Sequence, residues 1–277
     1  MSVHGFALLA LAAARDQQIK GELEARVAQR TAQLETLNRE LESFSYSISH
    51  DLKAPLRGVQ GYSRLLARDY RDRLDEDGRL FVAYIAKGVA EMQQLVDGLL
   101  AYSRMERRQE QPRPVNLADL VRDVLAGFGE ELATHGVELA VEVPEELITV
   151  DPEGLSMVLR NLVDNAVKFS QGSRPPRLFI GAEISSQRLL LKVRDNGIGF
   201  DMKFGERIFE IFSRLDNARQ VAGTGVGLAM VRRAVQRLGG RLEVASAPGD
   251  GTVFELEIPL PAVDDKKTGT ERGGNEH

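Results

Sequence analysis

The 277-residue chain is 43% apolar and 28% charged, with a net charge of −5, values typical of a soluble globular protein long enough for two domains. The acidic balance gives no reason to expect a nucleic-acid partner. The absence of cysteine excludes disulfide bonds, thiolate catalysis and cysteine-ligated metals, and it fits a reducing compartment.

An apolar run, FALLALAAA, extends from Phe6 to Ala14 near the N-terminus. It is well short of the roughly 20 residues that cross a bilayer as a helix. It also lacks the cationic segment that precedes a secretory signal. We interpret it as the tip of a coiled coil, with the stub of a membrane helix as the alternative. The expected location is therefore cytoplasmic, with membrane association only under the alternative.

Residues 23 to 48 carry apolar side chains at alternating spacings of four and three, interrupted only by Arg30. Nearly all intervening positions are polar, so the apolar stripe is narrow. This pattern is typical of a two-stranded coiled coil, and one amphipathic helix lying on a globular core is the alternative. A homodimer is therefore predicted, with a seam formed by Leu23, Val27, Leu34, Leu37, Leu41, Phe44 and Ile48.

The stripe continues into the segment SHDLKAPL, where His50 lies two positions from each of the seam residues Ile48 and Leu52. At about 100° per residue, His50 faces almost directly away from the seam. A lone histidine is usually an ordinary surface or core residue. With Asp51 beside it, however, an exposed imidazole could act as a nucleophile activated by a base. Pro55 is expected to bend the helix just past this histidine.

A second helical pattern runs from Phe81 to Tyr102, after a turn-like segment at residues 71–78. Two long helices joined by a short loop form a helical hairpin. Two hairpins from two chains would form a four-helix bundle. Pro112 and Pro114 then break the pattern and indicate a linker.

Beyond the linker, patterns of helix and strand alternate. A helix is predicted from Asn116 to about Ala133, and another begins at the capping pair Asp151–Pro152. A further helix follows the segment GTGVGL. The predicted strands are 137–143, 178–184, 188–194, 241–245 and 252–259.

The helix that follows Asp151 contains NLVDNAVKFS, in which Asn161, Asn165 and Lys168 are spaced i, i+4 and i+7. These three side chains therefore share one helix face. Two amides and an ammonium on one face could ligate a divalent cation and neutralise phosphate. An ordinary solvated face is the alternative.

Two glycine clusters follow, DNGIGFD at Asp195–Asp201 and GTGVGL at Gly223–Leu228. Glycine lets the backbone approach a ligand closely, and a glycine-rich helix N-terminus is an anion site. Asp195 could accept a hydrogen bond from an exocyclic amine such as that of adenine. Neither cluster fits the Rossmann, P-loop or eukaryotic protein-kinase motifs. Residues 206–222, between the clusters, are interpreted as a lid over a phosphate site.

In order and spacing, SHDLKAPL, NLVDNAVKF, DNGIGF, IFEIF and GTGVGL resemble the H, N, G1, F and G2 boxes of sensor histidine kinases. The resemblance covers about residues 20 to 260 and is strongest to kinases of the bacterial phytochrome type. It implies a multidomain α+β fold: a dimeric helical hairpin, then a two-layer α/β sandwich of the GHKL (Bergerat) type. In that sandwich a mostly antiparallel mixed sheet packs against helices on one face.

The resemblance also implies a reaction, in which His50 is phosphorylated by Mg-ATP while Asp51 takes its proton. The phosphoryl group then passes to an aspartate on a response regulator receiver domain. Asn165 would ligate magnesium, assisted by Asn161. The other implied ATP contacts are Lys168 and the candidate Arg214 on phosphate, Phe169 beside the adenine or ribose, Asp195 on the adenine amine, Gly197 and Gly199 in the pocket wall, and Gly223, Thr224, Gly225, Gly227 and Leu228 in the phosphate loop.

Phosphatase-competent members of this family carry Thr or Asn four residues after the histidine, where this chain has Ala54. Weak or absent phosphatase activity is therefore expected. A GHKL-type ATPase and an ATP-binding dimeric scaffold without histidine phosphorylation are the alternative functions. The sequence contains no recognisable sensor domain, so an upstream sensor domain or partner is expected. The predicted division is a signalling coiled coil at 1–44, the phosphotransfer hairpin at 45–109, a linker at 110–116, the catalytic domain at 117–260 and a disordered tail at 261–277.

Overall fold

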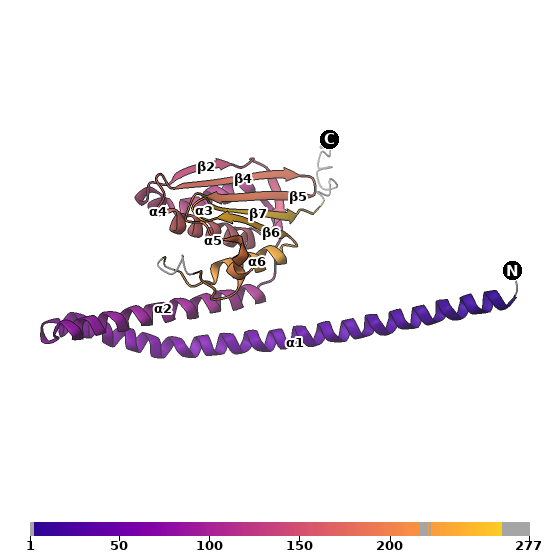
Figure 1. Cartoon of the computed structure of the whole chain (residues 1–277), viewed down its shortest axis with the longest axis horizontal. Helices are drawn as coiled ribbons and strands as arrows, with labels where there is room; N and C mark the ends of the chain where they lie inside the picture. Colours follow the sequence, from indigo (N-terminus) through magenta and orange to yellow (C-terminus); the bar gives the residue numbers. More distant parts are fainter. Residues whose placement is uncertain (1–2, 216–220, 222, 262–277) are drawn as a thin grey trace, which may run out of the picture.

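The computed structural model describes residues 3–215, 221 and 223–261, which form a helical hairpin followed by an α/β domain (Figure 1). The helices are α1 (Val3–Asp69), α2 (Glu76–Arg107), α3 (Leu117–Ala126), α4 (Gly129–Thr134), α5 (Pro152–Ser170) and α6 (Gly227–Arg237), with 3-10 turns η1 (Arg71–Arg73), η2 (Met202–Phe204) and η3 (Arg207–Phe209). The strands are β1 (Arg113–Asn116), β2 (Glu138–Glu142), β3 (Leu147–Val150), β4 (Arg177–Ser185), β5 (Arg188–Asp195), β6 (Arg241–Ala247) and β7 (Gly251–Pro259).

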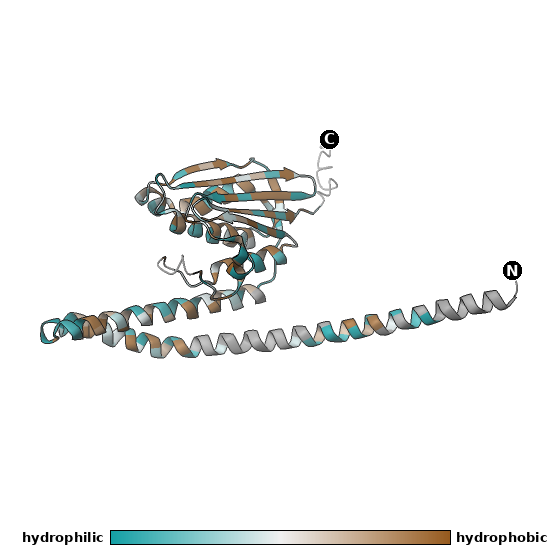
Figure 2. Cartoon of the chain, in the orientation of Figure 1, coloured by the Kyte–Doolittle hydropathy of each residue, from teal (hydrophilic) through white to brown (hydrophobic). Residues whose placement is uncertain are grey.

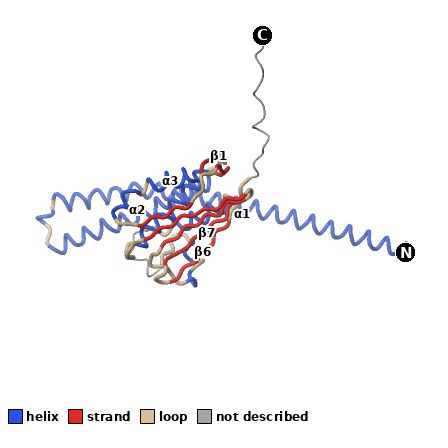
Figure 3. The backbone as a smooth tube through the Cα atoms, turned by 90° about the horizontal axis from the view of Figure 1, so that it is seen from above, coloured by secondary structure: helices blue, strands red, loops and turns tan. Residues whose placement is uncertain are grey.

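Helix α1 contains 67 residues and includes Pro55, so the helix does not end there, and the bend expected at this proline stays a prediction. Its N-terminal half projects away from the rest of the chain (Figures 1 and 3). Of the predicted seam, Leu23 and Val27 are 60% and 57% exposed, as unpaired coiled-coil positions would be in a single chain. Within the described part of the chain, no helix is long and apolar enough to cross a membrane.

The expected hairpin is formed by the C-terminal half of α1 and by α2. Asp75 caps α2 by accepting a hydrogen bond from the Gly78 N–H at 2.8 Å. Lys53 of α1 and Asp97 of α2 form an ion pair of 2.6 Å, which fixes the level at which the two helices face each other. Large apolar side chains stay exposed along the hairpin, and the predicted four-helix bundle would cover such a face: they include Leu52, Val59, Tyr62, Phe81, Tyr84, Ile85 and Met92.

The α/β domain has a five-stranded sheet in the order β2-β4-β5-β7-β6, in which β2 is parallel to β4 and the other pairs are antiparallel. Helices α3, α5 and α6 lie against one face (Figure 1). Apolar and polar residues alternate along the strands (Figure 2), so one face of the sheet meets the helices. This confirms the predicted two-layer sandwich. Its most buried side chains include Leu117, Leu155, Leu159, Leu162, Leu178, Ile180, Leu189, Leu191 and Leu256.

Three local features differ from the expectations. Residues 113–116, within the expected linker, form β1, which pairs antiparallel with β3 in a separate two-stranded sheet. Strand β3 had not been predicted. The helix expected to run to about Ala133 is divided at Gly127 and Phe128 into α3 and α4, because glycine weakens a helix interior. The lid residues 216–220 and 222 and the tail residues 262–277 lie outside the described residues.

Both predicted helix caps are formed. The Asn116 side chain accepts from the Asp119 N–H at 3.2 Å, and the Asp151 side chain accepts from the Gly154 N–H at 3.1 Å. The second cap fixes the start of α5, the helix that carries the polar face identified in the sequence. The apolar side of α5 is buried under the sheet, so its Asn161, Asn165 and Lys168 side is directed to the opposite side.

Candidate functional site

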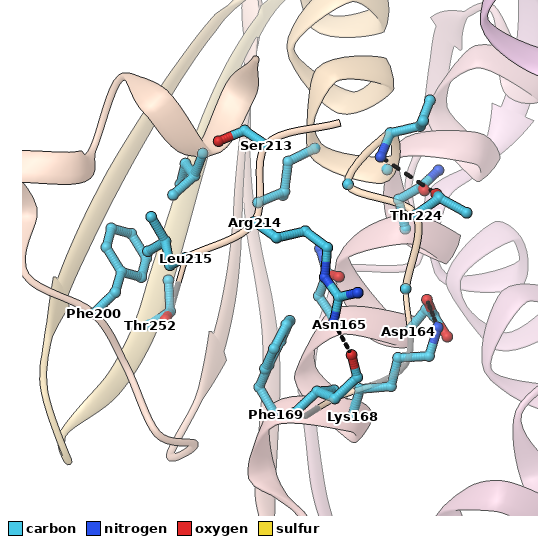
Figure 4. A pocket seen from close by; sticks show the side chains of 18 of the residues that line it. Asp164, Asn165, Lys168, Phe169, Phe200, Ser213, Arg214, Leu215, Thr224 and Thr252 are labelled. Carbon is cyan, nitrogen blue, oxygen red and sulfur yellow. Dashed lines mark hydrogen bonds and ion pairs between the residues drawn. The ribbon is translucent and has the colours of Figure 1, made fainter. Parts of the chain in front are cut away.

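A cavity of about 340 Å³ lies between α5, the loop after β5, the start of α6 and helix α2 (Figure 4). It brings together residues from the α5 polar face and from both glycine clusters. The two sequence-predicted catalytic residues, His50 and Asp51, do not line it. The predicted residues that do are Asn161, Asn165, Lys168, Phe169, Asp195, Gly199, Arg214, Gly223, Thr224, Gly225, Gly227 and Leu228.

The amides of α5 are presented to the cavity in different ways. Asn161 donates its Nδ2 hydrogen to the Met157 carbonyl at 2.8 Å, and its Oδ1 lies against Gly227, where an added Cβ would stand 2.8 Å away. Asn165 has a buried Nδ2 without a hydrogen-bond partner among the described residues. A buried amide without a partner costs free energy, so a polar ligand in the cavity would stabilise it.

Lys168 is not free for a ligand in this arrangement. Its Nζ forms an ion pair of 2.6 Å with Asp164, one helical turn earlier on α5. Asp164 also lines the cavity and was not singled out from the sequence, although the i, i+4 spacing to Lys168 was the available signal. Arg214 extends into the cavity from the segment after Ser213 (Figure 4), and its Nη2 donates to the Val221 carbonyl.

Asp195 lines the cavity from the C-terminus of β5. Its side chain accepts from the Gly197 N–H at 2.8 Å and from the Thr252 N–H, and the residue is only 8% exposed. Burial raises the pKa of this carboxyl to about 6, against the effect of the two N–H donors, which favour the charged form. At neutral pH the carboxylate is therefore mostly ionised, and it can accept further hydrogen bonds.

The first glycine cluster holds the loop after β5 in tight contact with its neighbours. A Cβ on Gly197 would lie 2.6 Å from the Phe169 carbonyl oxygen, and one on Gly199 would lie 2.0 Å from that of Ala247. Gly199 also has a positive φ of 56°. The Ile198 N–H donates to the Phe169 carbonyl at 3.1 Å. Gly197, which was predicted in the pocket wall, thus supports the cavity from behind and does not line it.

The second glycine cluster leads into α6. Gly225 has a φ of 71°, and a Cβ there would stand 2.7 Å from the Ser213 carbonyl oxygen. Its own carbonyl accepts from the Phe212 N–H at 3.0 Å. Among the described residues no side chain caps helix α6, which begins at Gly227, and Gly227 and Leu228 both line the cavity. This arrangement suits an anionic group.

Helix α2 supplies part of the cavity wall through Gln94 and Gly98. A Cβ on Gly98 would lie 3.0 Å from Val226 Cγ2, so this glycine allows α2 and the second glycine cluster to touch. The sequence carried no signal for this contact, because it depends on how the domain docks on the hairpin. Gly98 follows Asp97, the partner of Lys53. His50 precedes Lys53 by three residues, about 4.5 Å along α1.

The lining residues that sequence reasoning missed are mostly apolar. Besides Gln94 and Asp164, the polar ones are Ser213 and Thr252, and Thr252 pairs with Asp195 across β5 and β7. Within the described residues, no group of three or more His, Cys, Asp or Glu side chains could hold a metal ion. A cation in this cavity would therefore need most of its ligands from a bound molecule and water.

Two family models match the chain. The His Kinase A (phospho-acceptor) domain matches residues 40–108, and the histidine kinase-, DNA gyrase B- and HSP90-like ATPase matches residues 150–262. Together they cover about two thirds of the chain, in the order expected from the five boxes. The chain belongs to the sensor histidine kinases.

Relatives of this kinase include the phytochrome-like protein Cph1 of Synechocystis, with 34% identity over 84% of the chain and 31% of that protein. The methanogenesis regulatory histidine kinase FilI of Methanothrix harundinacea has 34% identity over 87% of the chain and 27% of that protein. The chain thus spans less than a third of the length of these relatives. Full-length ShkA in complex with AMPPNP has a similar structure, with a TM-score of 0.60 and 29% identity over 79% of the chain and 46% of ShkA.

Proposed function

We propose that this chain is the kinase core of a sensor histidine kinase, which binds Mg-ATP in the cavity and transfers its γ-phosphoryl group to His50. One observation carries the proposal. The cavity joins an acceptor for an amine at Asp195 to an anion-binding end at α6, and it meets the hairpin close to the level of His50. A nucleotide-binding site that served no nearby phosphoryl-accepting residue would not need to lie against the helical hairpin.

Asp195 would recognise the base. Above a pH of about 6 its carboxylate is ionised and accepts from the exocyclic amine of adenine. Phe169, at the C-terminal end of α5, would lie beside the adenine or ribose. Gly199 would form the adjoining wall, because its backbone already packs against Ala247 and leaves the ligand side without a side chain.

The phosphates would lie toward α6 and the α5 amides. The loop from Gly223 to Gly227 would wrap them with backbone N–H groups. Asn161 and Asn165 are the proposed magnesium ligands through their amide oxygens, and the unsatisfied buried Nδ2 of Asn165 would donate to a phosphate oxygen. When bound there, Mg²⁺ would offset the negative charge that phosphate oxygens carry. Lys168 would contact phosphate after leaving Asp164, and Arg214 is a candidate for the γ-phosphate.

In the transfer step, a ring nitrogen of His50 would attack the γ-phosphorus in line, forming an N–P bond while the bond to the bridging oxygen of ADP breaks. The exposed Asp51 would accept the imidazole proton. Helix α2 lies between the α/β domain and α1 in this structure (Figure 1). We therefore infer that the catalytic domain leaves this docked position before transfer.

Phosphohistidine would then pass its phosphoryl group to an aspartate of a response regulator. Ala54 is exposed one turn after His50, where it offers neither an amide nor a hydroxyl to orient water. Phosphatase activity toward the regulator is therefore expected to be weak or absent. Robust ADP-stimulated release of phosphate from a purified phosphorylated regulator would contradict this.

Labelling with γ-³²P-ATP tests the proposed function. Wild type should acquire an acid-labile, alkali-stable label that His50→Gln lacks, while Asp195→Asn should slow labelling by weakening nucleotide binding. A GHKL-type ATPase would release phosphate at an equal rate in wild type and His50→Gln without retaining label. An ATP-binding scaffold would bind nucleotide but neither hydrolyse it nor become labelled. Either of the last two results would overturn the proposal.

A further inference from the structure

The turn between β6 and β7 packs against the loop that forms the base end of the cavity. The Gly249 N–H donates to the Ile198 carbonyl at 2.8 Å. The Ala247 carbonyl oxygen occupies the place that a Cβ on Gly199 would need. The position of the loop after Asp195 is therefore set partly by this turn, which the predicted mechanism leaves without a role.

Ser246 stands where the two segments meet. Its Oγ accepts from the Phe200 N–H at 3.0 Å and donates to the Gly251 carbonyl at 2.7 Å. The same Oγ lies 3.1 Å from Oγ1 of Thr252, the residue that lines the cavity beside Asp195.

The hydrogens in this cluster can be assigned. A serine hydroxyl has one hydrogen, and a carbonyl oxygen can only accept, so the Ser246 hydrogen lies on the bond to Gly251. The contact between Ser246 and Thr252 must then use the hydrogen of Thr252. Once this hydrogen is directed at Ser246, the Thr252 oxygen has only lone pairs to offer to a ligand.

This orientation decides which base edge fits. Asp195 and Thr252 together present two acceptors at one end of the cavity. An exocyclic amine supplies two N–H donors and satisfies such a site. A keto oxygen at the same ring position would place its lone pairs against the lone pairs of Asp195 and Thr252. These buried acceptors would then lack donors, which lowers the affinity for the nucleotide.

We propose that Ser246 is a positioning residue that holds the Thr252 hydroxyl as an acceptor and thereby favours 6-aminopurine over 6-oxopurine nucleotides. The inference rests on the proposed function, because it takes the cavity to be the purine-nucleotide site. It adds a specificity determinant that acts through Thr252 and that no motif in the sequence identified.

The test compares the affinities of ADP and IDP, both as magnesium salts, by isothermal titration calorimetry on the full chain. The two nucleotides differ at the 6-position and its adjoining ring nitrogen. Ser246→Ala frees the Thr252 hydroxyl to donate, so the IDP-to-ADP ratio of Kd should fall by about fivefold to tenfold, the worth of one hydrogen bond. Ser246→Thr keeps a hydroxyl and should preserve the ratio.

Thr252→Val provides the matched variant. It should lower the ratio by itself, and adding Ser246→Ala to it should cause no further fall, because Ser246 acts through the threonine. A purely structural role of Ser246 would weaken ADP and IDP equally, and an unchanged ratio in Ser246→Ala or in Thr252→Val would overturn the inference. A wild type that binds neither nucleotide would instead contradict the proposed function, and the inference with it.

Discussion

Arg108 places its guanidinium on the side chain of Asp151, joining the end of α2 to the cap of α5. Its Nη2 donates to Oδ1 at 2.6 Å, its Nη1 donates to Oδ2, and its Nε donates to Glu153 at 2.8 Å. The Asp151 side chain is only 2% exposed and also accepts the Gly154 N–H. One carboxylate thus connects the phosphotransfer hairpin to the helix that carries Asn165.

Replacing this arginine should destabilise the docked structure. Arg108→Met leaves a buried carboxylate with fewer partners, and we expect the free energy of unfolding at pH 7 to fall by about 1–3 kcal/mol in chemical denaturation. The matched control is Arg122→Met, whose ion pair with Asp119 is 64% and 59% exposed. Its effect should stay below about 1 kcal/mol. If the two substitutions lowered the free energy of unfolding equally, the buried Arg108–Asp151 pair would stabilise the protein no more than an exposed ion pair does.

The same pair should give stability a dependence on pH. Burial alone would raise the pKa of Asp151, but the hydrogen bonds and charge of Arg108, with the Gly154 N–H, hold it below its ordinary value. A depressed folded pKa contributes stability that is present above the unfolded value, near 4, and is lost as the pH falls through the folded value. The stability difference between wild type and Arg108→Met should therefore shrink below a pH of about 4. A constant difference down to pH 2 would contradict this assignment.

The Arg108–Asp151 pair also shows which features of the fold could be predicted from the sequence and which could not. The Asp151 cap was predictable, because a capping residue and a proline at the first helical position are local signals. Its partner lies 43 residues away, and nothing local selects one arginine among many. Strands β1 and β3 were missed for a similar reason, since four residues are too few to show a strand period.

The residues of the candidate site likewise fall into those that the sequence predicts and those that only the tertiary structure reveals. Asn165, Asp195 and the glycine clusters lie in motifs whose spacing is fixed along the chain, and the cavity does bring them together. Gly98 and Thr252 reach the cavity only through docking on α2 and through strand pairing, which are tertiary events. The ion pair of Lys168 with Asp164 could have been predicted from the i, i+4 spacing of the two residues. That spacing does not show whether a bound ligand would displace Asp164 from Lys168.

Nucleotide affinity should follow the protonation of Asp195. Its pKa is raised to about 6, so at pH 5 only about a tenth of the carboxyl groups would be ionised and able to accept from the adenine amine. We expect ADP affinity to fall by about tenfold between pH 7.5 and pH 5 in calorimetric titrations. The nucleotide phosphates titrate in the same range, so Asp195→Asn, which shares their titration but lacks the carboxyl, is the control. A pH profile identical in the two proteins would exclude Asp195 as the source.

Gly98 tests the contact between the hairpin and the catalytic domain. An added Cβ would lie 3.0 Å from Val226 Cγ2 and 3.5 Å from Thr224 Oγ1, so a larger side chain has no room while the domain is docked. Gly98→Leu should therefore separate the domain from α2. The expected result is a larger radius of gyration in small-angle X-ray scattering and faster tryptic cleavage at Arg108, which the docked domain engages.

Gly88 is the matched control for this prediction, because it lies on the same helix with no atom within 4 Å of a built Cβ. Gly88→Leu should leave the radius of gyration and the cleavage at Arg108 unchanged, and it should stabilise α2 by removing a glycine from a helix interior. Since the docked domain is separated from α1 by α2, undocking is also the step that we expect before phosphoryl transfer. If Gly98→Leu retained the compact radius and the slow cleavage, the contact of α2 with Val226 would not hold the domain in place.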